Sequence, residues 1–197
     1  RRWASEPSIP GVVRFFGPYP YRSSFHSENP AQECERALAH LDELLMFEGA
    51  HNVAAIILEP VVGTNGILVP PDGYLAGVRE LCNRYGIMMI SDEVMAGFGR
   101  CGEWFAVDHW GVAPDISCVA KGVNSGYVPL GGVLMSDAIA ATFDERVYPG
   151  GLTYSGHPLA CASAVASIGA FRDENILDSA RTLGTDVIGP ELELIAE

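Results

Sequence analysis

The chain contains a single lysine, Lys121, among 12 basic residues, and the others are all arginine. Because this composition otherwise supplies positive charge as arginine, a lone lysine indicates a position where a guanidinium would not serve. A guanidinium stays protonated, whereas an amine can lose its proton and attack a carbonyl carbon. The apolar run Ile116–Val119 ends just before Lys121, and Gly122 follows it. Burial at the end of such a strand lowers a lysine pKa, so we expect Lys121 to act as a nucleophile or base; a solvated lysine is the alternative.

Carboxylates follow two other apolar runs of the chain. Glu59 ends one run, and the pair Asp92-Glu93 ends the next. Ligands of an open α/β sheet bind beyond the carboxyl ends of its strands, so these groups and Lys121 would converge if the three strands are neighbours. An amine, a carboxylate and a nearby phosphate-binding turn are what a pyridoxal phosphate (PLP) site needs: the lysine bonds to the cofactor and the carboxylate keeps the pyridinium nitrogen protonated. A simple ion pair is the alternative.

The elements that must position these residues follow from the spacing of the apolar residues. Apolar residues at helical spacing predict helices, and short β-branched runs predict strands. The predicted helices are 31–47, 73–85, 158–171 and a last one from 174 that breaks at Gly189-Pro190, and the predicted strands are 12–16, 53–58, 87–91, 116–119 and 132–135. Strands that are apolar on both faces and alternate with helices predict an α/β fold, with a mainly parallel sheet flanked by helices.

Composition narrows the partners and the compartment. The formal net charge is -13 and the sequence pI is about 4.7, so the electrostatic field disfavours nucleic acid and anionic membranes, and we expect neither as a partner. The five cysteines are odd in number and form no Cys-x-x-Cys pair, which favours free thiols in a reducing compartment such as the cytoplasm over disulfides or a metal site. The chain opens Arg-Arg-Trp, and its first methionine is Met46, so we expect an internal piece of a longer protein.

A literal G-x-G-x-x-G occurs at residues 97–102, the pattern of dinucleotide-binding turns. Such a turn directly follows a strand and opens a helix. Here Asp92–Ala96 intervenes, and Trp104-Phe105 follows without a helical pattern. A nicotinamide-dependent oxidoreductase is therefore the weakest of the enzyme hypotheses.

Several motifs, in order along nearly the whole chain, resemble those of the class III aminotransferases, which are PLP enzymes of fold type I. They are Glu59-Pro60, Pro71-Asp72-Gly73-Tyr74-Leu75, Ser91-Asp92-Glu93-Val94-Met95-Ala96-Gly97-Phe98-Gly99-Arg100, Ala120-Lys121-Gly122, Pro129-Leu130-Gly131-Gly132 and Thr153-Tyr154-Ser155-Gly156-His157-Pro158-Leu159-Ala160. The agreement of several independent motifs is far more specific than any one of them.

The resemblance implies a role for five residues. Lys121 would hold PLP as a Schiff base and then move the proton between the substrate α-carbon and C4′ of the cofactor. Asp92 would bind the pyridine nitrogen, and Val94 would pack against a face of the ring. Thr153 would reach the phosphate of the cofactor in the neighbouring subunit, because such enzymes are homodimers with shared active sites. Glu59 would border the cofactor pocket.

Two departures from the family pattern narrow the branch. Ornithine- and GABA-type members have Gln after Asp-Glu-Val, where this chain has Met95, and a gating Glu in the loop after Glu-Pro, where this chain has Thr64. The chain is therefore more similar to the omega-amino-acid or taurine–pyruvate branch. This similarity implies transfer of an amino group from an omega-amino acid or amine to a 2-oxo acid, with pyruvate favoured over 2-oxoglutarate.

The resemblance also implies a domain organisation. Residues 1–171 would belong to the large PLP-binding domain, and residues 172–197 would form a helix leading towards a small C-terminal domain that this chain does not contain. Without the rest, these 197 residues are expected to bind PLP weakly or not at all. Two alternatives stay open: a class III relative with other PLP chemistry, such as an aminomutase or decarboxylating transaminase, and a truncated, non-catalytic scaffold.

Overall fold

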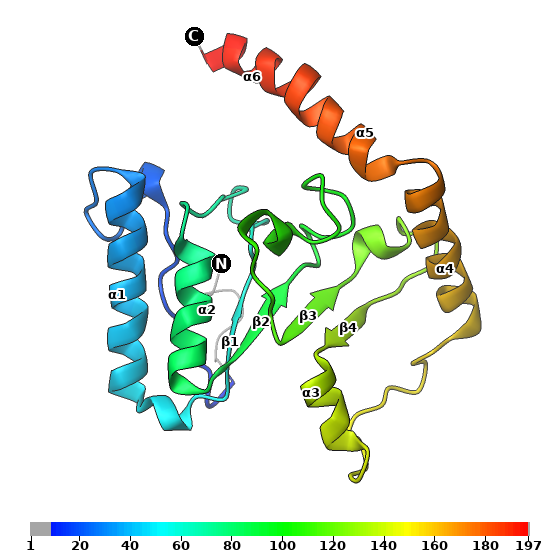
Figure 1. The fold of residues 1–197 in the computed structure, drawn as a ribbon, viewed down its shortest axis with the longest axis horizontal. Coiled ribbons are helices and arrows are strands. Elements are labelled where there is room, and N and C mark those ends of the chain that lie inside the picture. The colour runs from blue at the N-terminus through cyan, green and yellow to red at the C-terminus, as the bar shows by residue number, and fades with distance from the viewer. Residues whose placement is uncertain (1–8, 197) are drawn as a thin grey trace.

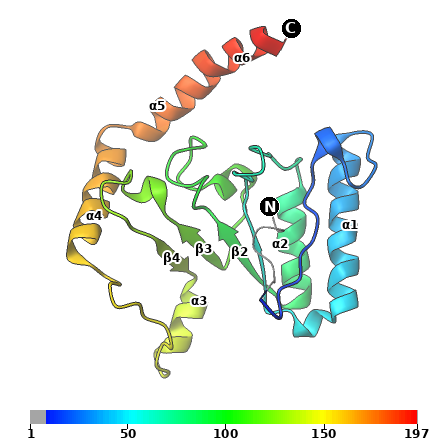
Figure 2. The same ribbon diagram turned by 180° about the vertical axis from the view of Figure 1, so that it is seen from behind.

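A computed structural model describes residues 9–196, which form one four-stranded sheet with helices around it (Figures 1 and 2). The strands run in the spatial order β1 (Ala55–Leu58), β2 (Met88–Asp92), β3 (Ile116–Val119) and β4 (Gly132–Met135). The first three are parallel, and β4 is antiparallel to β3. The predicted α/β class with a mainly parallel sheet is confirmed, and β1, β2 and β3 are neighbours, as convergence of their carboxyl ends requires.

Helices α1 (Pro30–Glu48) and α2 (Tyr74–Tyr85) lie side by side against the β1–β2 part of the sheet (Figure 1). Helix α1 begins where the Asn29 side chain accepts a hydrogen bond from the Gln32 N–H at 2.9 Å, an N-cap that satisfies a free donor of the first turn. Helix α2 ends at Gly86, whose left-handed backbone suits glycine. Apolar side chains between the helices and the strands form the core: Ala37, Leu41, Leu45, Ile56, Leu75, Val78, Cys82 and Met89.

The segment before α1 runs along this helix without forming a strand, with Phe16 bonded to His40 and Tyr19 to Glu33. The strand predicted at residues 12–16 is wrong, because this stretch makes no ladder with the sheet and Val12 and Phe16 are exposed. The segment is attached by side chains of α1 instead. Buried Glu33 accepts hydrogen bonds from the Tyr19 N–H at 2.7 Å and from the hydroxyls of Ser23 and Ser27. β-branched residues alone do not make a strand when no partner edge is in reach.

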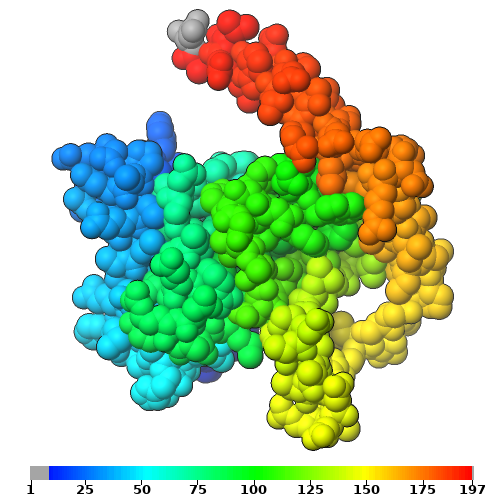
Figure 3. Space-filling view, viewed as in Figure 1, coloured from blue at the N-terminus to red at the C-terminus, as the bar shows by residue number. Residues whose placement is uncertain are grey.

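The helices after β4 are separated into two groups by a long loop at residues 144–157. This part of the chain contains α3 (Asp137–Ala140), α4 (Pro158–Asp173), α5 (Ile176–Thr182), a π-helical segment η7 (Leu183–Ile188) and α6 (Gly189–Ala196). The short 3₁₀ helices of the chain are η2 (Pro20–Arg22), η3 (Ala50–Asn52), η4 (Ala106–Trp110), η5 (Lys121–Val123) and η6 (Ala141–Phe143). From α5 to α6 the chain forms a rod that extends away from the sheet (Figures 1 and 3).

The helix break predicted at Gly189-Pro190 is wrong, since the helix continues through both residues. The Gly189 N–H bonds to the Gly184 carbonyl, five residues back, within the wider π-helical turn. A proline in an α-helix clashes with the carbonyl four residues before it and lacks an N–H. The wider turn gives the Pro190 ring room and changes the pattern of bonded carbonyls at this point.

Candidate active site at the carboxyl ends of the parallel strands

The polar residues singled out in the sequence lie at one edge of the sheet. Glu59 directly follows β1, Asp92 is the last residue of β2, and Lys121 begins η5 two positions after β3. Asp92 is paired with Cys118 of β3 in the strand register. Because β1, β2 and β3 are parallel, all three residues occupy the carboxyl edge, where open α/β sheets bind their ligands.

Asp92 and Glu93 face different surroundings, as expected for consecutive residues at the end of a strand. Asp92 is half-buried, and its Oδ1 accepts from the Val94 N–H at 3.1 Å. Glu93 is fully buried and accepts from the N–H groups of Ala106 at 3.0 Å and Val107 at 3.1 Å. Asp92 is thus the carboxylate left for a ligand, while Glu93 holds η4 against the end of β2.

The structural role of Glu93 was not predicted from the sequence. Burial raises the pKa of Glu93 above its ordinary value, although the two backbone donors and the Ser91 hydroxyl act in the opposite direction. The alternation of side chains at a strand end is the signal that could have separated it from Asp92: Glu93 shares a face with buried Ser91, and Asp92 does not.

Glu59 closes the loop after β1. Its Oε2 accepts from the Gly63 N–H at 2.9 Å, and the loop continues to the isolated bridge between Val62 and Leu68. A Cβ at Gly63 would lie 3.0 Å from the Cγ of Met95, so this loop packs tightly on the segment that follows β2. The loops after β1 and β2 therefore meet beside Glu59, and half-buried Val94 lies next to this contact in the chain.

Lys121 has a left-handed backbone, with φ at +43°, and an exposed side chain. The burial predicted from its apolar flank is wrong for this chain, because β3 stops at Val119 and the glycines that follow Lys121, Gly122 and Gly126, provide no side chains to cover it. The lysine lines an open cavity of about 530 Å³. In the part of the chain that is described, no hydrogen bond or ion pair joins Lys121 to Asp92.

The cavity beside Lys121 lies between the turn after β3, the glycine-rich turn after β2 and the junction of α4 and α5. Its lining consists of Phe98, Gly99, Arg100, Lys121, Gly122, Ser125, Gly126, Phe171 and Ile176. The G-x-G-x-x-G stretch therefore packs against helices that come much later in the chain, and the element that follows it is the short η4. This is not the strand–turn–helix arrangement of a dinucleotide site.

Thr153 is exposed, in the segment between η6 and α4, and it is not among the residues that line the cavity beside Lys121. Residues 9–196 include no helix with the length and apolar character needed to span a bilayer. They also include no cluster of three or more His, Cys, Asp or Glu side chains arranged to hold a metal ion.

Comparison with known proteins identifies the family. The sequence profile described as aminotransferase class-III matches residues 2–197. The chain belongs to the class III aminotransferase family. It is 41% identical over 174 residues to the putrescine–pyruvate aminotransferase of Pseudomonas aeruginosa, covering 88% of this chain and 38% of that protein. It is 43% identical over 155 residues to the omega-amino acid–pyruvate aminotransferase of Pseudomonas putida, covering 74% of this chain and 34% of that protein.

The fold of this class III chain matches solved transaminases. The taurine:2-oxoglutarate aminotransferase of Bifidobacterium kashiwanohense, solved in complex with PLP and glutamate, superposes with a TM-score of 0.93 at 45% identity, covering 98% of this chain and 44% of that one. The prediction of a PLP-dependent transferase fold of type I, present in part, is thereby confirmed. The chain spans well under half the length of these relatives.

Proposed function

We propose that the whole protein is a PLP-dependent aminotransferase in which Lys121 binds the cofactor covalently and Asp92 contacts the pyridine nitrogen. The observation that carries the proposal is the position of an amine and a half-buried carboxylate after neighbouring parallel strands, in a chain of the class III family. These groups fit the cofactor, since PLP needs an amine for its aldehyde and an anion for its ring nitrogen. When bound, PLP supplies an electron sink for bonds at the substrate α-carbon.

The residues of this chain would then act as follows. The Nζ atom of Lys121 would hold the aldehyde group of the cofactor and, when free, would serve as the base that takes up and returns the proton of the substrate α-carbon. The Asp92 carboxylate would hold the pyridine nitrogen. Val94 supplies an apolar contact for the ring, and Glu59 keeps the neighbouring loop in place through the Gly63 N–H.

The amino donor is proposed to be an omega-amino acid or amine and the acceptor pyruvate. Two relatives carry pyruvate in their names, whereas the structural neighbour with the TM-score of 0.93 uses 2-oxoglutarate. In this chain Met95 packs on Gly63. The next residue, Thr64, is exposed and, being a threonine, offers no carboxylate to pair with a gating arginine. Single-turnover assays on the amino form of the enzyme, with pyruvate in one series and 2-oxoglutarate in the other, decide the acceptor.

Borohydride reduction with PLP tests the central assignment. We expect reduction to fix the cofactor to Lys121 Nζ, found by mass spectrometry of the tryptic peptide, and Lys121→Arg to abolish both labelling and transamination while keeping the charge. Labelling of the Lys121→Ala variant to the same extent would overturn the assignment.

The remaining features of the proposal come from the family. We propose a homodimer in the cytoplasm in which Thr153 serves the partner's cofactor, with residues 1–171 in the large domain and 172–197 leading to a small domain. Thr153 does not line the cavity beside Lys121 of its own chain, which supports its action on a second subunit. Product analysis tests for other PLP chemistry, which would give products other than the transaminated pair. Titration with PLP tests for a scaffold role, which a protein that never binds PLP would indicate.

A further inference from the structure

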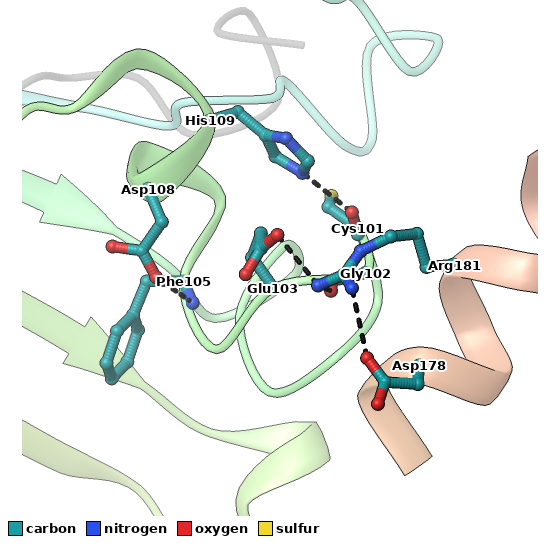
Figure 4. A network of polar contacts seen from close by, with 8 residues as sticks. All are labelled: Cys101, Gly102, Glu103, Phe105, Asp108, His109, Asp178 and Arg181. Carbon is teal, nitrogen blue, oxygen red and sulfur yellow. Dashed lines mark hydrogen bonds and ion pairs between the residues drawn. The ribbon is translucent and has the colours of Figure 1, made fainter. Parts of the chain in front are cut away.

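The glycine loop, residues 97–105, is a tight turn that the proposed chemistry does not use. Its backbone closes on itself, with the Phe98 N–H bonded to the Trp104 carbonyl at 2.7 Å and the Gly99 N–H to the Glu103 carbonyl at 3.0 Å. On the η4 side, His109 Nε2 donates to the Cys101 carbonyl at 2.7 Å (Figure 4). These bonds tie the two arms of the loop to each other and to η4.

One side of the glycine loop is fastened to α5 by Arg181 (Figure 4). Its Nη2 donates to the Gly102 carbonyl at 3.1 Å and pairs with Glu103 Oε1 at 2.9 Å. Its Nη1 pairs with Asp178 one turn earlier at 3.0 Å, which orients the guanidinium. Arg181 thus joins two segments that are 79 positions apart in the chain.

Apolar contacts reinforce this attachment. A Cβ at Gly99 would lie 2.8 Å from Phe171 and 3.1 Å from Leu177, so the loop backbone is pressed against the junction of α4 and α5. The ring of Phe98 also meets that of Phe171 edge-on, with the centroids 6.5 Å apart.

The other side of the glycine loop supports the turn that carries Lys121. A Cβ at Gly122 would lie 2.8 Å from the Cβ of Phe98 and 3.2 Å from its carbonyl oxygen. The backbone of Lys121 lies in the left-handed region, which non-glycine residues avoid unless their surroundings impose it. The close contact of Phe98 with Gly122 packs the glycine loop against this turn.

We propose that Arg181 is a positioning residue for Lys121, acting through the glycine loop. The guanidinium fixes Gly102 and Glu103 to α5, and the loop transmits this position through Phe98 to the turn at Lys121-Gly122. A displacement of α5 therefore displaces the lysine. The inference rests on the proposed role of Lys121 in holding PLP.

Amide hydrogen exchange in the whole protein without PLP tests the link directly. In Arg181→Gln we expect exchange to be about three- to tenfold faster both in the glycine loop and in residues 119–126, because the lost contacts are a partly exposed ion pair and a charged hydrogen bond. Glu103→Gln, which leaves α5 unchanged, should show about a twofold effect in the same two segments. Arg172→Gln is the matched control, since Arg172 is exposed near the end of α4 and has no polar partner among residues 9–196.

A second readout separates positioning from general loosening. With PLP bound, the pH midpoint of the cofactor absorbance band should move in Arg181→Gln and Glu103→Gln and stay at the wild-type value in Arg172→Gln. Faster exchange in the glycine loop with residues 119–126 unchanged would overturn the proposal, as would an unmoved pH midpoint. If borohydride fails to label Lys121 in the wild-type protein, the proposed function fails, while the exchange data still decide whether Arg181 holds the turn.

Discussion

Substitution of Gly122 by alanine would test how closely the turn at Lys121 approaches the glycine loop. Carbon atoms in contact settle at about 3.5–4.0 Å, whereas the new Cβ would lie 2.8 Å from the Cβ of Phe98, an overlap of at least about 0.7 Å. The atoms it meets belong to the backbone or are fixed to it, so no flexible side chain can move aside. The φ angle of Gly122 is not in the left-handed region, so the cost comes from contact alone. Overpacking of this kind destabilises by about 1–3 kcal/mol.

Urea unfolding of the whole protein measures this cost. For an m-value of about 2 kcal/mol/M, a loss of about 2 kcal/mol lowers the urea midpoint by about 1 M. Gly17→Ala is the matched control, since a Cβ there meets no atom of residues 9–196 within 4 Å and φ is not left-handed; we expect its midpoint to stay at or slightly above the wild-type value.

Activity should fall as well, because a shift of about 1 Å in a catalytic group can cost about 100-fold in rate. Equal urea midpoints and equal PLP labelling for Gly122→Ala and Gly17→Ala would show that the two turns do not hold each other.

Three further predictions concern the residues that support the sheet and its first helix. Glu93→Gln places an amide NH₂ against one of the two backbone N–H groups of η4, so we expect a loss of about 1–3 kcal/mol. Burial raises the pKa of Glu93. The stability that Glu93 contributes is therefore full below the ordinary Glu pKa and is lost as pH rises through the raised value. The difference in urea midpoint between the wild type and the variant should shrink as pH rises. Asp115 behaves in the opposite way: burial pushes its pKa up, but hydrogen bonds from Arg79 at 2.6 Å and from the Met89 N–H at 2.7 Å, with the arginine charge, hold the pKa below its ordinary value. Asp115→Asn should cost about 1 kcal/mol at neutral pH, with the gap closing as pH falls through that lowered pKa; a gap that is constant with pH would contradict the assignment. Asn29→Ala removes the N-cap of α1 and should cost about 1 kcal/mol by thermal or urea unfolding, while Asn29→Ser should restore most of it.

Short-range pattern was enough to predict much of the fold and the main candidate residues. The apolar runs predicted the four strands of the sheet within two residues at each end, and helices α1, α2 and α4 nearly as well. The single lysine and the carboxylate after β2 drew attention to one edge of the sheet, and the motifs around them predicted the family that the comparison confirmed. These signals are local, because burial on both faces of a strand, helical periodicity and a motif are all properties of a few consecutive residues.

Tertiary packing decided what no local pattern contains. The sequence does not show that backbone N–H groups of η4 bind the Glu93 carboxylate, or that Lys121 is exposed in this chain. Nor does it show that Arg181 meets Gly102 across 79 positions. Each of these depends on which distant backbone atoms come within hydrogen-bond or contact distance. The local sequence around a donor, a charge or a glycine is the same whether or not the fold brings such a partner close to it. The sequence thus determined the chemistry available at the edge of the sheet, and the packing of distant segments determined how that chemistry is held.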